Sequence, residues 1–288
     1  MLGLKRGEVA LLPHQKEWEI EAQNTICRLK EILGDIIIDI AHVGSTSIPA
    51  IKAKPIIDIA VAVKDFDAVL AIENVLREQG FYYRPDIHTW QLLFASGNYY
   101  DGTGDLQTHF IHVVKAGSTE WINYINFRDY LTANPKVAKE YEALKESIAS
   151  LPHIDREKYT SAKHEFITHT LRKALVFSYL GKTVGIKIDR PMGSVHPKHP
   201  GLVYPINYGY IPTVIGGDGE ELDVYLLGVD APVDKFTCRI IGIVHRHNDS
   251  EDKLIAAPEG VILSAKEIKE AVAFQEKYFD SEIEVLYV

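Results

Sequence analysis

Helical and strand-like patterns of apolar residues alternate along the first part of the chain. From Lys16 to Leu33 apolar residues recur at the spacing of one helix face, and Gly34 is placed to end the helix. Two apolar, β-branched runs of strand length follow, at Ile36–His42 and Pro55–Val63. The same criteria predict helices at Asp67–Gln79, Tyr124–Leu131, Pro135–Ala149 and Lys158–Leu180, and strands at Gln91–Phe94 and Thr108–Val114. This alternation predicts an α/β or α+β domain with a mixed sheet.

The pattern changes after Gly181 to short strands separated by Pro- and Gly-containing turns. The predicted strands are Val184–Ile188, Asp223–Leu227, Lys235–His245 and Leu254–Ala256, and one helix, Ala265–Tyr278, follows them. Short strands with a closing helix favour a small closed β-barrel of the OB-like type. We therefore expect two domains, residues 1–177 and 178–288, with a boundary close to Ser178–Lys182.

Composition and charge narrow the class of protein. The 288 residues suffice for two domains that each bury a core. The net charge of -9 argues against unaided binding to nucleic acid or to anionic membranes, and the apolar runs are too short to span a bilayer. Cys27 and Cys238 fall in different predicted domains and imply no disulfide framework. Because the N-terminal residues also lack a signal-like apolar core, we expect a soluble cytoplasmic protein.

Acidic residues cluster in two turns of the second predicted domain. Asp218–Asp223 contains four acidic side chains in six residues around Gly219, and a second cluster follows at Asp249–Asp252. Carboxylates so close together repel one another, and hard cations such as Mg²⁺ relieve that repulsion. The alternative is that both segments are acidic surface turns.

A phenol-rich segment, Tyr204–Ile211, precedes the two acidic turns. In this order the three segments resemble the soluble, magnesium-dependent inorganic pyrophosphatases. The resemblance implies Mg²⁺ as cofactor, with Asp223 nearest the attacking water and with Tyr208 and Lys253 as further catalytic residues. The metal ligands and phosphate contacts that it implies are Asp218, Asp223, Asp249 and Asp252 for the metal, and Tyr208, Lys253 and Tyr278 for phosphate.

The phosphate side departs from the family pattern. Lys187 lies near the place of a usual glutamate, the usual Lys and Arg before the tyrosines are missing, and Phe279 follows Tyr278 where a lysine is expected. A differently built basic loop, Arg190–His199, lies there instead. Its candidates to replace the missing phosphate contacts are Arg190, His196 and Lys198. The alternative is a Pro-kinked surface loop.

The first domain resembles the GrpB family, which shares its core with the nucleotidyltransferases. The resemblance rests on the Gly-Ser turn after the first strand and the acidic residue on the next strand, and it implies nucleotide binding by His42, Gly44, Ser45, Lys54 and Asp58. Small residues in such a turn let backbone N–H groups approach phosphates. However, Ala60 stands where a transferase needs its second carboxylate, and nothing requires Asp39 to substitute for it. His109 and His112 are three residues apart on a strand and should point to opposite faces.

We therefore expect a magnesium-dependent phosphoanhydride hydrolase, acting on inorganic pyrophosphate, in the second domain. Two alternatives stay open. The first domain transfers nucleotides while the second removes the released pyrophosphate, or both sites bind nucleotide or phosphate without catalysis. The expected partner is a small molecule, pyrophosphate or a nucleotide, and homo-oligomerisation stays open.

Overall fold

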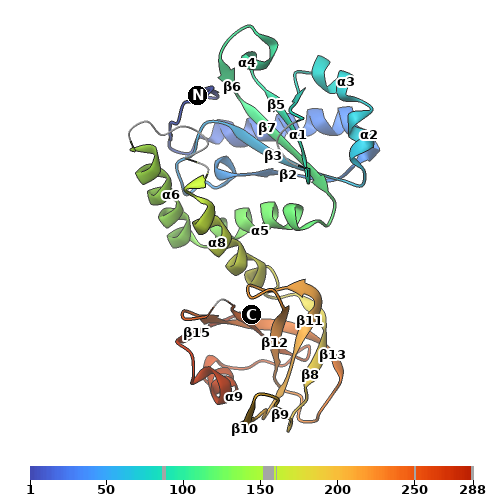
Figure 1. Ribbon diagram of the computed structural model, residues 1–288, viewed down its shortest axis with the longest axis vertical. Helices are drawn as coiled ribbons and strands as arrows, with labels where there is room; N and C mark the ends of the chain where they lie inside the picture. Colours follow the sequence, from blue (N-terminus) through green and yellow to red (C-terminus); the bar gives the residue numbers. More distant parts are fainter. Residues whose placement is uncertain (86–88, 152–158, 160, 250, 287–288) are drawn as a thin grey trace. The chain divides into compact units, whose positions relative to one another are not determined.

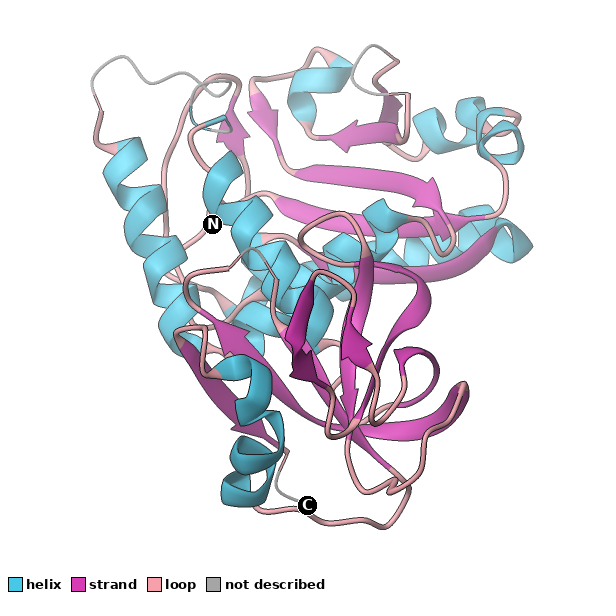
Figure 2. Ribbon diagram, turned by 60° about the horizontal axis from the view of Figure 1, so that its bottom comes forward, coloured by secondary structure: helices cyan, strands magenta, loops and turns pink. Residues whose placement is uncertain are grey.

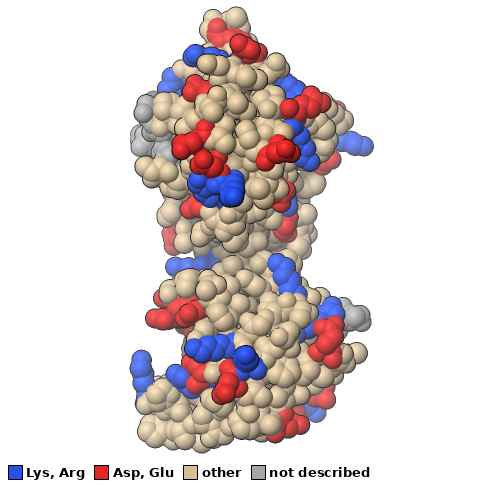
Figure 3. Space-filling view, turned by 90° about the vertical axis from the view of Figure 1, so that its right-hand side faces the viewer, with Lys and Arg blue, Asp and Glu red and all other residues tan. Residues whose placement is uncertain are grey.

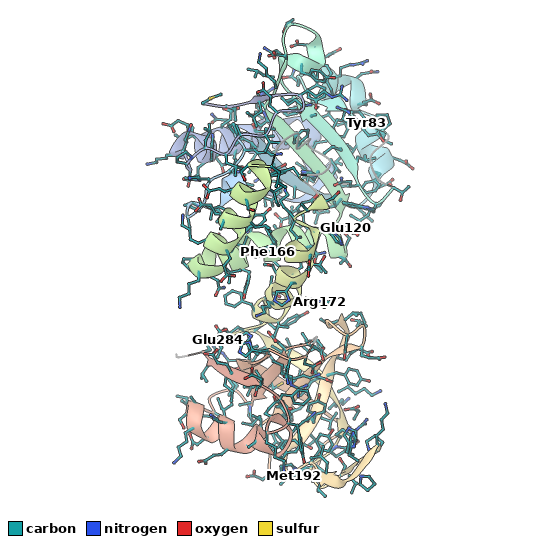
Figure 4. The ribbon with its side chains drawn as sticks, turned by 60° about the vertical axis from the view of Figure 1, so that its left-hand side comes forward. Tyr83, Glu120, Phe166, Arg172, Met192 and Glu284 are labelled. Atoms are coloured by element: carbon teal, nitrogen blue, oxygen red, sulfur yellow. The ribbon has the colours of Figure 1, made fainter. Side chains whose placement is uncertain are left out.

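The computed structural model describes residues 1–85, 89–151, 159, 161–249 and 251–286. Its contacts divide the chain into two compact units, Met1–Leu171 and Arg172–Val288 (Figure 1). The division falls inside helix α8, His164–Phe177, upstream of the boundary expected from the sequence. In the first unit Phe166 of α8 stacks on Tyr141 of helix α6, with ring centroids 5.2 Å apart (Figure 4).

The first unit is a mixed five-stranded sheet covered by helices. The strand order is β2-β3-β7-β5-β4, and only β3 and β7 are parallel. These strands are β2 Ile37–Val43, β3 Ile57–Val63, β4 Tyr82–Tyr83, β5 Leu92–Ser96 and β7 His109–Lys115, and β1 Leu4–Lys5 pairs separately with β6 Leu106–Gln107. The helices are α1 Lys16–Leu33, α2 Phe66–Leu70, α3 Glu73–Glu78, α4 Asn98–Asp101, α5 Thr119–Ala133 and α6 Pro135–Ala149. The predicted α/β architecture is confirmed (Figure 2).

Alternation along the central strand β3 decides which residues reach each face of the sheet. Ile57 and every second residue after it join the apolar core under α1, together with Trp18 and Leu29. Asp58 therefore points to the opposite face. There it meets His112 of β7, which hydrogen-bonds Tyr124 of α5 at 3.0 Å. The polar groups of this unit thus gather on the α5 side of the sheet.

The second unit is a closed five-stranded barrel. Its strands are β8 Thr183–Arg190, β11 Asn207–Ile215, β12 Glu221–Leu226, β13 Lys235–Arg246 and β14 Lys253–Ala257. Strand β14 pairs in parallel with β12 and antiparallel with β13, and this second pairing closes the barrel. The outer elements are β15 Ser281–Val285 on β13, the hairpin β9 Val195–His196 and β10 His199–Val203, and helix α9 Ala265–Glu276. The predicted barrel with a terminal helix is confirmed.

The barrel strands also have two chemically different faces. Their inward residues form one apolar cluster, which includes Ile186, Val224 and Leu254. Their outward residues form a second cluster with α9, in which Tyr225 packs beside Ile268. Helix α9 begins in a capping box between Ser264 and Glu267, which satisfies its first backbone N–H groups. On β12 and β14 the even-numbered residues therefore lie in the core, and the odd-numbered residues lie on the face beside α9.

Some predicted elements differ from the observed ones. The predicted helix Asp67–Gln79 is two short helices, because Ile72 leaves the helical region with φ -113° and ψ 20°. The predicted helix Lys158–Leu180 is α8 in its described part, and its predicted start lies outside the described residues. Strands β11 and β15 were not predicted. Among the described residues, no helix combines the length and the apolarity that crossing a bilayer requires.

Truncation tests how much of the barrel core lies upstream of β8. Val176 is buried in the inner cluster, with Phe177 and Leu180 packed against it, and Gly181 and Lys182 hydrogen-bond Ile240 of β13. We expect a fragment starting at Arg172 to unfold cooperatively. A fragment starting at Thr183 should lose about 3–5 kcal/mol of unfolding free energy, since it lacks these buried side chains. Urea denaturation of both fragments measures the difference, and equal midpoints and slopes would show that residues 172–182 contribute nothing.

Candidate active site

Neighbouring strands place Tyr208, Asp223 and Lys253 side by side on the outer face of the barrel. Tyr210 of β11 is the register partner of Asp223 in β12, and Val224 is the partner of Leu254 in β14. One step back along β12 and β14, Asp223 therefore neighbours Lys253. The two side chains form an ion pair, and the Tyr208 phenol hydrogen-bonds the Asp223 carboxylate. The structure thus brings the three predicted catalytic residues together.

Glu251 joins this group, although it was not predicted to. The Lys253 ammonium also pairs with Glu251, whose residue is 4% exposed. Glu251 Oε1 is buried and has no hydrogen-bond partner among the described residues. Burial, with the negative charges of Asp223 and Asp218, raises the pKa of Glu251 to about 7, while Lys253 opposes the rise. This carboxylate oxygen is positioned to accept a bond from a group that carries positive charge.

Asp249 and Asp252, two of the four predicted metal ligands, are held by other partners. Asp249 accepts a hydrogen bond from Arg246 at 2.8 Å. Asp252 pairs with His245 at 2.7 Å and accepts the Arg246 backbone N–H at 3.1 Å. Glu251 lies two residues before Lys253 and shares its face, whereas Asp252 lies on the other face. The turn therefore directs Glu251, and not Asp252, toward Asp223.

The acid turn supplies a further carboxylate at the surface. Asp218 is exposed and accepts the backbone N–H of Glu220 at 2.9 Å, and its charge contributes to the raised pKa of Glu251. Asp189 of β8 is a fourth acid in this neighbourhood. Burial and the charge of Asp223 raise the pKa of Asp189, against the effect of Arg190. Within the described chain, no three acidic, histidine or cysteine side chains are close enough to form a metal site by themselves.

Two of the predicted substrate-binding residues, His196 and Tyr278, line one cavity of about 510 Å³ beside the β9–β10 hairpin. The other lining side chains include His199, Leu202, Gln275 and Phe279. The His196 ring stacks on Tyr204 at 6.1 Å between centroids, and Tyr204 lies 5.5 Å from Tyr208. A continuous set of aromatic rings therefore connects this cavity with the partner of Asp223.

Arg190 and Lys198 occupy different positions. Arg190 pairs with Asp189 at 2.9 Å and hydrogen-bonds the Tyr204 phenol. Lys198 is exposed in the hairpin, where its backbone N–H donates to His196 Nδ1 at 3.1 Å. Partial burial and the nearby cations lower the pKa of His196, so its ring is neutral at pH 7 and contributes hydrogen bonds rather than charge.

The predicted nucleotide-binding residues of the first unit divide into two groups. Ser45, Lys54 and Asp58 line one cavity of about 170 Å³. Gly44 has φ 70° and packs on Asp58, where a Cβ would lie 2.5 Å from the carboxylate. His42 instead hydrogen-bonds Thr46 at 2.9 Å, and burial lowers its pKa to about 4.

A second carboxylate for this cavity is absent from the neighbouring strand. Asp58 pairs with Val43 in β2, whereas Asp39 pairs with Ala62. The two acids are thus separated by four residues along the sheet, or roughly 13 Å. His109 and His112 point to opposite faces as predicted, because His109 contacts Thr25 of α1 and His112 contacts Asp58. Two-metal chemistry therefore lacks a ligand here.

The comparisons with known proteins agree with the division of the chain into two units. The family model for the GrpB protein matches residues 8–173. The "Glutamate-rich protein GrpB" of Alkalihalophilus pseudofirmus is 38% identical over 175 residues, which cover 60% of this chain and 99% of that protein. The chain belongs to the GrpB family. A crystal structure of GrpB from Enterococcus faecalis superposes on 57% of this GrpB-family chain and 96% of its own, with 27% identity and a TM-score of 0.52.

The GrpB-family chain also carries a second domain, because the inorganic pyrophosphatase family model matches residues 149–283. The inorganic pyrophosphatase of Saccharolobus solfataricus is 39% identical over 77 residues. This match covers 25% of the GrpB-family chain and 41% of that pyrophosphatase. The two predicted resemblances, to the GrpB family and to the inorganic pyrophosphatases, are thus confirmed at the level of the family.

The buried ion pairs beside the site give the GrpB-family protein a pH-dependent stability. Burial opposes protonation of His245, but hydrogen bonds to Asp252 and to Glu284 (Figure 4) raise its pKa to about 9. The unfolded value is near 6.5, so the stabilisation is complete below pH 6.5 and is lost as pH rises through 9. We expect the unfolding free energy of the second unit to fall by about 2–3 kcal/mol between pH 6.5 and pH 9.

Urea denaturation of the wild type and of His245→Gln, at constant ionic strength, measures this contribution. The variant should be less stable at pH 6, and the difference should disappear near pH 9.5. A difference that is constant with pH would mean that the ring acts by packing and not by its charge.

Proposed function

We propose that the second domain hydrolyses phosphoanhydride bonds with Mg²⁺, with inorganic pyrophosphate as its substrate. The observation that carries this proposal is the set of Tyr208, Asp223, Glu251 and Lys253 on one face of the barrel, with a buried carboxylate oxygen that has no partner in the described part of the chain. The match to the pyrophosphatase family model supports the same reaction class.

The carboxylates fit a divalent cation. Asp223 and Glu251 pair with one ammonium, Lys253, and the charge of Asp218 acts on Glu251. These acids do not yet form a closed ligand set, but Glu251 Oε1, which has no hydrogen-bond partner among the described residues, is a ligand of the kind that a hard cation takes. We assign the metal to these three acids, with Glu251 in place of Asp249 and Asp252. When bound, Mg²⁺ supplies a water of lowered pKa and neutralises phosphate charge.

The protein's own residues then have separate tasks. Asp223 accepts a proton from the attacking water, and the Tyr208 phenol fixes the orientation of the Asp223 carboxylate. Lys253 carries the positive charge that stabilises the oxygens of the departing phosphate. The cavity with His196 and Tyr278 receives the distal part of the substrate. Acidic and basic side chains are interspersed on the face drawn in Figure 3, which shows no extended basic surface of the kind that binds nucleic acid.

Substitution of the acids tests the assignment. Asp223→Asn should lower phosphate release from pyrophosphate by about 100-fold or more, since it removes the proton acceptor. Glu251→Gln should raise the Mg²⁺ concentration needed for half-maximal activity by about tenfold or more. Asp249→Asn is the matched control, because its partner Arg246 lies outside the cluster, and it should keep activity within about twofold.

Phosphate release is measured across a Mg²⁺ titration, with pyrophosphate, short polyphosphates and nucleotides as substrates. Wild-type turnover in excess chelator equal to that in Mg²⁺ would contradict the proposal. A larger loss in Asp249→Asn than in Glu251→Gln would return the metal to the ligand set expected from the sequence. Turnover of nucleotides alone would change the substrate but not the site.

The hairpin residues provide a second test. His196→Ala should raise KM for pyrophosphate by about 5- to 30-fold, since the ring lines the cavity beside Tyr278. Lys198→Ala should act in the same direction and more weakly, because its side chain is exposed. Steady-state kinetics at matched ionic strength give both values. Unchanged KM in the two variants would make the hairpin a structural turn.

A further inference from the structure

The cavity of the first unit has an unusual distribution of charge. Among the described residues that line it are three lysines, Lys54, Lys145 and Lys163, and one carboxylate, Asp58. Asp58 already pairs with His112 at 3.2 Å. The lining is therefore richer in ammonium groups than in carboxylates.

Lys145 is the buried member of this group. It lies on α6 and is 1% exposed, in the same stripe as the apolar residues Tyr141 and Ile148. Its ammonium donates to the Lys52 carbonyl and lies 4.7 Å from the Tyr141 ring centroid. Within the described chain, it forms no ion pair with a carboxylate. Burying an ammonium with only a neutral acceptor is costly, so this position favours an anion in the adjoining cavity.

The carboxylates closest to Lys145 along α6 face other partners. Glu142 accepts the Lys52 backbone N–H and pairs with Lys139 at 2.7 Å. Glu146 pairs with the Lys52 ammonium. Neither side chain lines the cavity as described. Within the described residues, no carboxylate supplies a counter-charge to Lys145, which leaves a bound anion to supply it.

The two other lysines converge on one aromatic ring. The Lys54 ammonium lies 3.8 Å and the Lys163 ammonium 4.6 Å from the centroid of Tyr159, which is itself 1% exposed. Lys163 is also close enough to Lys145 to lower its pKa. Three ammonium groups thus approach one space from α6, from the loop before β3 and from the segment before α8.

The size and the donors of the cavity define the ligand class. At about 170 Å³ the cavity has room for roughly five or six water molecules and is smaller than a site for a drug-sized ligand. A carboxylate offers two oxygens, whereas a phosphate group offers three or more in different directions, which matches three separated ammonium groups. With one carboxylate in the lining, a divalent cation has too few ligands.

We propose that this cavity binds a phosphate group, with Lys54, Lys145 and Lys163 as its counter-charges, and that it does so without a divalent cation. The site is independent of the function proposed for the second domain. Its ligand is inorganic phosphate or the terminal phosphate of a small molecule that extends to solvent.

Binding should be coupled to protonation of Lys145. Burial and the charge of Lys163 lower its pKa to about 7, against the effects of Glu142 and Glu146, and Lys139 lowers it further. A bound anion favours the charged form, so the pKa rises on binding and affinity falls as pH increases above 7. The acidic group that faces the same cavity among the described residues is Asp58, which pairs with His112.

Isothermal titration of the full chain in excess EDTA, with inorganic phosphate as the probe at pH 7, tests the site. We expect one site per chain, and Lys163→Met and Lys54→Met should each weaken binding by about tenfold or more. Lys136→Met, on the exposed part of the same helix α6, is the matched control. Lys253→Met, in the second domain, shows whether the phosphate is bound there, because Lys253 is the residue assigned to phosphate in that domain. Lys136→Met should not change the affinity, and neither should Lys253→Met if the phosphate binds in the first domain.

Sulfate, which does not titrate in this interval, is the probe for the pH dependence. Its affinity should fall about tenfold per pH unit above pH 7, and the ε-carbon NMR signal of Lys145 should titrate near pH 7 without sulfate and at a higher pH with it. Lys145→Met should also weaken binding. If this variant does not fold, the Lys54→Met and Lys163→Met variants and the NMR signal of Lys145 test the site without it.

Three results would overturn the proposal. One is the absence of phosphate binding up to tens of millimolar. Another is binding that is lost in Lys253→Met but retained in Lys163→Met. The third is binding of acetate or citrate at least as tight as that of phosphate, which would make the cavity a carboxylate site.

Discussion

Strand β14 is hydrogen-bonded on both sides, and the chemistry of the second unit depends on this closure. Because side chains alternate along a strand, the closed barrel divides every strand into an apolar inner set and an outer set. Asp223 and Lys253 meet only because β12 and β14 are neighbours in the register that puts Val224 beside Leu254. A shift of one residue would move the two charges into the interior, where they would face Ile186 and Leu222. The packing of the core therefore fixes the geometry of the site.

The two units present opposite electrostatic situations. Beside the barrel, two carboxylates, Asp223 and Glu251, share the Lys253 ammonium, and the charge of Asp218 adds to theirs, which suits a cation. In the first unit, Lys145 is buried without an acidic partner, which suits an anion. In both places an isolated buried charge costs more than the fold gains from burying it. Each excess is the physical basis of the ligand proposed for that unit.

Regular periodicity allowed much of the fold to be predicted. Helices α1 and α6 have the predicted bounds, because their apolar stripes are unbroken and a Gly or a Pro marks an end. Strand β11 was missed, since Asn207, Gly209 and Pro212 conceal its alternation. The motifs pointed to Asp223 and Lys253 as site residues, but not to their ion pair and not to Glu251. Counting back two residues from Lys253 on its strand would have indicated Glu251.

Other parts of the sites depend on tertiary structure that no local pattern contains. The burial of Lys145 needs the packing of α6 against the rest of its unit, although one local signal exists: the residue falls in line with Ala138, Tyr141 and Ile148. The direction of Asp249 and Asp252 depends on Arg246 and His245, which the sequence places nearby without showing which way they point. Local charge spacing gives the composition of a turn, and the neighbours of that turn decide its orientation.

Glu251 has one more neighbour, Gly216, and this contact limits which residues can stand at position 216. A Cβ at Gly216 would lie 1.9 Å from Glu251 Oε1, so the observed position of this carboxylate requires that residue 216 has no side chain. Gly216 itself lies in a turn, in which its N–H donates to the Glu220 carbonyl at 2.7 Å. An alanine at position 216 would therefore displace the carboxylate end of Glu251, and with it the buried oxygen that faces the site.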